Sequence, residues 1–145
     1  MGFHFTLASV LAVRHRREQA EERSLAQISS ELETARQAIH RINMELRRLA
    51  MERNAEPPRS MQATDLHERY GRLSLFEQGR QETLTRIADL SARREAQQQI
   101  YLLARRDREL LENLQTAQRS VYAAGLARQE NKRNEDAFLA RYLRD

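Results

Sequence analysis

The chain has 145 residues, no Cys, no Trp, four Gly and two Pro, and 32% of its residues are charged. Without thiols it can form neither disulfides nor cysteine-ligated metal sites, and a reducing cytoplasm suits it best. The abundance of Ala, Leu, Glu, Gln and Arg is typical of long helices rather than of a globule. The net charge of +4 arises from 25 basic residues mixed with 21 acidic ones, so it predicts only a modest attraction to acidic partners.

The first residues, MGFHFTLASVLAVRHRR, place an apolar run directly before a basic run. A secretory signal has its positive charge before the apolar run, so this order argues against an export signal. Met1, Gly2 and Thr6 fit a loose myristoylation pattern, which is a weaker alternative. No apolar run reaches the roughly 20 residues that span a bilayer. We therefore expect a protein that is soluble or at most peripheral to a membrane.

A heptad pattern follows in the first third of the chain. Apolar residues alternate at spacings of three and four through four heptads, which predicts the a/d seam of a coiled coil. The seam residues are Leu25, Ile28, Leu32, Ala35, Ile39, Ile42, Leu46 and Leu49. We expect a helix over about 5–53 that needs a partner helix.

The tandem Pro57 and Pro58 form the strongest helix breaker in the chain. They predict a turn at about 54–60, after which Ser60 or Thr64 can cap a second helix over about 61–142. Two helices joined by a short turn should fold back on each other. The predicted fold class is therefore all-α, a long two-helix antiparallel coiled-coil hairpin forming a single domain with an overhanging C-terminal helix.

The second helix has a less regular apolar pattern. The heptad spacing seen in the first helix is repeated at the start of the second. It is lost through SARREAQQQ and resumes in a shifted phase from Ile100. The expected seam residues are Leu66, Tyr70, Leu73, Leu84 and Ile87, and then Leu103, Leu110, Leu114, Ala117, Val121 and Ala124.

The register of the hairpin can be predicted by counting outward from the Pro pair. This count places Glu21 opposite Arg93, where the seams of both helices turn polar, and Phe5 opposite about Glu109. Some 35 residues of the second helix would then extend beyond the first, roughly 50 Å of helix. Because this overhang carries an apolar stripe, we expect another protein to cover it.

Motifs for catalysis or ligand binding are missing from the sequence. The four Gly residues form no phosphate-binding loop, and no His has another His three or four residues away. Arg and Glu alternate, without the aromatic and basic motif of nucleic-acid-binding modules. We expect no enzyme, no metal or other cofactor, and no nucleic-acid partner.

The motif F-x-F-x-L-x-x-V-L-x-x-R opens the chain, LHERYGRL follows the mid-chain break, and LLENLQTAQRSVYAAGLARQENKRNED lies near the C-terminus. Together they resemble the FliJ family, the stalk proteins of the bacterial flagellar type III export apparatus. One departure is the order of the acidic pair near the C-terminus, Glu135 and Asp136. The related stalk of virulence injectisomes, a generic coiled-coil scaffold and a homodimer that exchanges its overhanging helices remain alternatives.

The resemblance implies a non-enzymatic stalk, monomeric alone, on the cytoplasmic face of the inner membrane at the flagellar base. Its expected partners are a hexameric export ATPase, a membrane export-gate protein and export chaperones. The expected contacts to the ATPase ring are Phe3, Phe5, Leu7, Val10, Leu11, Arg14, Leu110, Leu114, Arg119, Val121, Tyr122 and Arg128. The expected contacts to the export gate, at the hairpin tip, are Ile42, Glu45, Leu49, Tyr70, Leu73 and Phe76.

Overall fold

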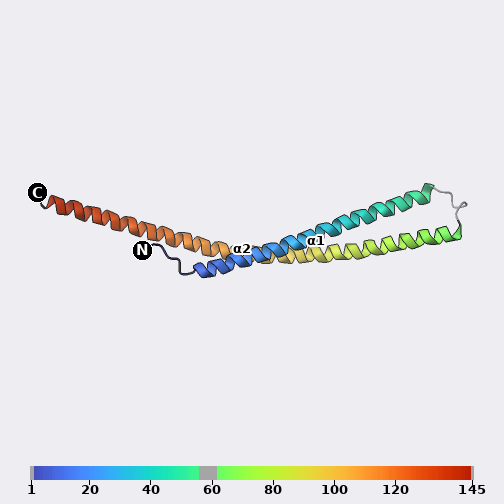
Figure 1. Cartoon of the computed structure of the whole chain (residues 1–145), viewed down its shortest axis with the longest axis horizontal. Coiled ribbons are helices and arrows are strands. Elements are labelled where there is room, and N and C mark those ends of the chain that lie inside the picture. The colour runs from blue at the N-terminus through green and yellow to red at the C-terminus, as the bar shows by residue number, and fades with distance from the viewer. Residues whose placement is uncertain (1, 56–61, 145) are drawn as a thin grey trace. The chain divides into compact units, whose positions relative to one another are not determined.

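The computed structural model describes residues 2–55 and 62–144, which form two long helices and, within these ranges, no strand. Helix α1 spans Ala8–Ala55 and helix α2 spans Ala63–Tyr142 (Figure 1). The two helices pack against each other and run in opposite directions, because Asn43 contacts Arg80 whereas Glu21 contacts Gln97. The predicted all-α antiparallel hairpin is confirmed.

The chain divides into two compact units. Residues Met1–Ala20 and Leu102–Asp145 form one, called the terminal unit below, and Glu21–Tyr101 forms the other, called the middle unit. Both helices contribute to each unit. No helix in the described parts of the chain is long and apolar enough to cross a membrane.

The first helix begins three residues later than expected. The amide of Ala8 donates to the carbonyl of Phe5 at 3.1 Å, and that of Leu11 donates to Leu7 at 2.9 Å, so the helix forms only from Ala8. The side chain of Phe5 is buried, which favours the non-helical path of residues 2–5 over a further helical turn.

The start of α2 also differs from the prediction. The carbonyl of Gln62 accepts hydrogen bonds from the amides of Asp65 and Leu66 at 3.1 and 3.2 Å, so Gln62 occupies the N-cap position. Thr64 lies inside the first turn and is not the cap. Asp65 adds a favourable charge at the positive end of the helix dipole. Ser60 and most of the expected turn at 54–60, including the Pro pair, lie outside the described residues.

The core of the middle unit is thin. Leu32 and Ala35 of α1 pack with Leu90 of α2, and the partly buried Ile87 packs against them. All eight residues of the predicted α1 seam are buried or half-buried, which confirms the heptad phase of this helix.

The seam of α2 keeps a single heptad phase where a shift was predicted. In the terminal unit the side chains turned away from solvent are Ala104, Arg108, Leu111, Gln115 and Tyr122, which stand in register with Ile87 and Leu90. The residues expected there are exposed instead, namely Leu103, Leu110, Leu114, Ala117, Val121 and Ala124. Likewise, Leu73 and Ile87 belong to the seam, whereas Leu66, Tyr70 and Leu84 are exposed.

The register of the hairpin differs from the count based on the Pro pair. Glu21 meets Gln97, about one turn beyond Arg93. Phe3 meets Tyr122, about three turns beyond the position expected from the pairing of Phe5 with Glu109. The C-terminal end of α2, red in Figure 1, therefore extends beyond the N-terminal segment by about 20 residues, roughly 30 Å, instead of 35 residues.

Candidate functional site

An aromatic contact fixes the N-terminal segment to α2. The rings of Phe3 and Tyr122 have centroids 5.7 Å apart and are tilted by 53°, a favourable edge-to-face type of arrangement. The Arg119 guanidinium lies 5.5 Å from the centroid of the Phe3 ring, close enough for a cation–π interaction. The structure thus brings together Phe3, Arg119 and Tyr122, all three predicted as ATPase contacts, but through contacts within the chain.

Charged side chains join the two helices next to this contact. Arg108 donates to both carboxylate oxygens of Glu18, in a bidentate ion pair, and donates to Glu112 at 2.6 Å. The side chains of Arg108 and Glu18 are only 17% and 13% exposed, so solvent screens this pair weakly. The hydrogen bonds to Glu18 raise the pKa of Arg108 above its ordinary value, and the side chain therefore remains charged.

Two further pairs extend the cluster. Arg14 lies 3.4 Å from Asp107, and His15 Nε2 lies 3.0 Å from a carboxylate oxygen of Glu112. Arg14, a predicted ATPase contact, is thus directed to α2. We refer to Arg14, His15, Glu18, Asp107, Arg108 and Glu112 as the charged layer.

The predicted ATPase contacts separate into two groups. Phe5 and Leu11 are buried, and Phe3, Arg14, Arg119 and Tyr122 contact other residues of the terminal unit. The remaining side chains are exposed, namely Leu7, Val10, Leu110, Leu114, Val121 and Arg128. This second group is open to a partner in the present conformation, as is the exposed Arg119 of the first.

Three members of the exposed group belong to an apolar row on α2, which is interrupted between residues 103 and 110. We call this row the outer stripe, and its residues are Leu103, Leu110, Leu114, Ala117, Val121 and Ala124. All six are exposed on α2, although the helix is paired with α1 along part of this length. An exposed row of large apolar side chains is a feature of protein-binding surfaces.

The predicted tip residues lie in the middle unit. Ile42, Leu49, Leu73 and Phe76 are half-buried on the sides of the helices that form the seam. Tyr70 is exposed. Glu45 is half-buried and forms an ion pair with Arg48 at 2.8 Å.

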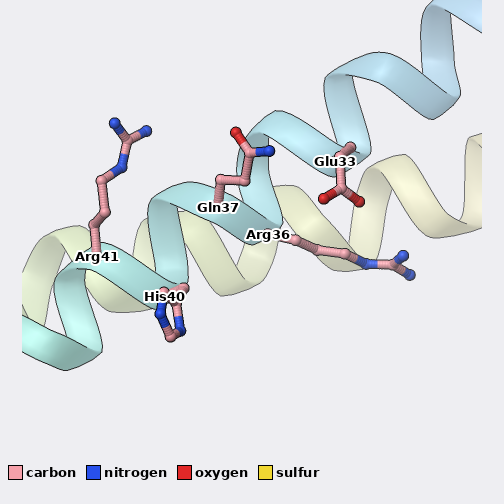
Figure 2. A pocket seen from close by; sticks show the side chains of 5 residues that line it. All are labelled: Glu33, Arg36, Gln37, His40 and Arg41. Atoms are coloured by element: carbon pink, nitrogen blue, oxygen red, sulfur yellow. The ribbon is translucent and has the colours of Figure 1, made fainter.

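The outer face of α1 in the middle unit is polar, unlike the apolar outer stripe of α2. A shallow hollow there is lined by the polar side chains of Glu33, Arg36, Gln37, His40 and Arg41. Figure 2 shows these side chains leaving one stretch of helix in different directions, so they do not converge on a ligand. Across residues 2–55 and 62–144, no group of three or more His, Asp and Glu side chains comes together in a way that could hold a metal ion.

The charged layer was not predicted from the sequence, although a signal for it exists. Three heptads beyond Ile87 lies Arg108, and a heptad count that tolerates polar residues would have placed this cation in the seam. Glu18 lies one heptad before Leu25 and so continues the seam of α1, and its charge is opposite to that of Arg108.

A known protein family matches nearly the whole chain. The family model described as "Flagellar FliJ protein" matches residues 3–145. The match includes the N-terminal segment that starts at Phe3 and the outer stripe. No curated protein and no solved structure matches the chain.

Proposed function

Because the chain belongs to the flagellar FliJ protein family, and so is a component of the flagellar protein export apparatus, we propose that it acts as a stalk for the export ATPase. In this proposal the terminal unit enters the hexameric ATPase ring and stimulates ATP hydrolysis there. The stalk itself catalyses nothing. The observation that carries the proposal is the outer stripe, an apolar row left exposed on a long helix.

The outer stripe supplies most of the affinity in this proposal. Transfer of apolar surface from water to a protein interface contributes about 25 cal/mol per Å². Exposed ion pairs, such as those that Arg128 can form with acidic side chains of the ring, contribute only about 0 to 1 kcal/mol each. We therefore expect the apolar side chains to decide whether the ring binds and the arginines to adjust the salt dependence.

The members of the predicted set that pack within the terminal unit have a supporting role. Phe3 and Phe5 hold the N-terminal segment against the rest of the terminal unit. This arrangement presents the exposed Leu7 and Val10 within the same unit as the outer stripe. Both helices can then contribute apolar side chains to one partner.

The test is a double substitution, Leu114→Asp with Val121→Asp, which places two charges in the outer stripe. We expect it to abolish stimulation of the purified export ATPase while circular dichroism shows unchanged helix content. The matched control is Leu84→Asp with Leu75→Asp in the middle unit, because the exposures of these residues, 38% and 69%, are close to the 39% and 73% of the tested pair. Parental stimulation by the tested variant would contradict the proposal.

We propose a second contact at the hairpin tip, where the middle unit binds the membrane export gate through Tyr70 and its half-buried neighbours. The exposed Tyr70 supports this proposal, since a Tyr side chain offers a large contact area at a small entropic cost. Export chaperones are further proposed partners, and the cytoplasmic face of the inner membrane is the proposed location.

The tip contact is tested with Tyr70→Glu. We expect weaker binding to the export gate in a pull-down and unchanged stimulation of the ATPase. Leu73 is a less suitable target because it is half-buried, so a charge there would also disturb the packing of the helices. Loss of both activities together would argue against a separate gate-binding surface.

A further inference from the structure

Helix α2 carries two heptad seams in the terminal unit. One seam, which includes Ala104, Arg108 and Leu111, is turned toward the interior of the unit. From Leu110 to Ala124 the outer stripe also alternates at spacings of four and three, and Leu103 lies one heptad before Leu110. Each member lies one residue before a heptad position of the first seam, which places the stripe roughly 100° around the helix from that seam. A seam with this repeat stays aligned over three heptads only with another helix that supercoils around it.

The charges around the outer stripe indicate what such a helix carries. Between residues 103 and 128, every acidic side chain already has a basic partner within the terminal unit. Asp107 pairs with Arg14, Glu109 with Arg105, and Glu112 with Arg108.

Two arginines at the outer stripe form no ion pair with the part of the chain that the structure describes. Among the described residues, Arg106 and Arg128 have no carboxylate partner. Arg106 lies beside the stripe, and Arg128 continues its heptad positions one turn after Ala124. The exposed face therefore combines an apolar row with uncompensated positive charge.

We propose that the outer stripe binds one amphipathic helix of a partner protein, in coiled-coil packing, and that this helix has acidic residues beside its apolar seam. The inference rests on the proposed function, since it specifies the element of the ring ATPase that the terminal unit contacts. A second copy of this chain fits the stripe poorly, because the acidic residues of the same segment are already paired. The small side chains of Ala117 and Ala124 allow the partner helix its closest approach in the C-terminal half of the stripe.

The charge requirement is tested with synthetic peptides and the full chain. Two three-heptad peptides share one apolar seam, and the flanking positions are all Glu in one and all Lys in the other. Fluorescence anisotropy should show binding of the Glu peptide at least tenfold tighter than that of the Lys peptide. The double variant Arg106→Glu with Arg128→Glu should reverse this preference, and Leu114→Asp should abolish binding, whereas the control Leu75→Asp should not. Equal affinity for both peptides, or binding that survives Leu114→Asp, would overturn the inference.

Cross-linking separates this inference from the proposed function. A photo-reactive residue at position 103, 110, 114 or 121 of the full chain is activated in the presence of the export ATPase. Cross-linked sites that lie on one acidic helix, at spacings of three, four or seven residues, would support the inference. Sites on loops of the ATPase would overturn it and leave the proposed function standing. If no cross-link to the ATPase forms and the Leu114→Asp, Val121→Asp variant stimulates normally, the inference and the proposed function are both overturned. Cross-links between two copies of the chain would overturn the choice of partner.

Discussion

Arg108 shows how one residue can decide the packing of a long hairpin. Its guanidinium holds Glu18 of α1 and Glu112 of α2 at the same time, at a position where an apolar side chain would be usual. A charged group inside a seam tolerates fewer alignments than an apolar one, because a shift by one turn breaks its bidentate pair with Glu18. The charged layer therefore favours one register of the terminal unit.

Removal of this cation should destabilise the protein. In Arg108→Met, Glu18 stays in the seam without its bidentate partner, and we expect the free energy of unfolding in urea to fall by about 1 to 3 kcal/mol. The matched control is Arg106→Met on the same helix, where no carboxylate contact is lost and little change is expected. The double variant Glu18→Met with Arg108→Met should recover most of the loss. A single variant as stable as the control would show that the pair has no structural role.

At the scale of the helices, stability depends on a narrow seam. Two helices enclose far fewer side chains than a globular core, so each fully buried residue of the middle unit carries a large share of the packing. Leu90, Leu32 and Ala35 are the residues that form this core.

Truncation of the core should therefore be costly. Leu90→Ala removes a side chain that is 2% exposed, and we expect a loss of about 2 to 4 kcal/mol, measured by urea unfolding followed by circular dichroism. Leu84→Ala, on the exposed side of the same helix, is the control. Similar losses for the two variants would mean that Leu90 is no more buried in the seam than Leu84.

At the scale of the whole molecule, the oligomeric state distinguishes a stalk from a self-pairing scaffold. We expect a single monomeric species in sedimentation equilibrium, because the acidic residues between positions 103 and 128 already have basic partners. A dimer that dissociates in the Leu114→Asp and Val121→Asp variant would instead show that two copies cover the stripe themselves.

The sequence predicted some parts of this molecule better than others. The α1 seam was predictable because all eight of its residues are apolar. The phase of the α2 seam that packs on α1 was not predictable, since this seam contains the polar residues Arg108 and Gln115. The outer stripe has the more regular apolar pattern and was therefore chosen instead. The cap at Gln62 uses a main-chain carbonyl, and the burial of Phe5 depends on packing distant in sequence, so neither leaves a local signature. The docking residues at the two ends stay predictions.

The end of α2 beyond Tyr122 has consequences for motion. Its side chains up to Arg144 are exposed, so its helical structure is maintained by local hydrogen bonds alone. Most helical stability in proteins comes from tertiary packing, which this end of the helix lacks in the described residues. Amide hydrogen exchange should therefore be fast over residues 126–142 and slow around Leu90, with protection of the former rising when the ATPase is added. Equal protection of both regions in the free protein would contradict this expectation and would mean that tertiary contacts hold the end of α2.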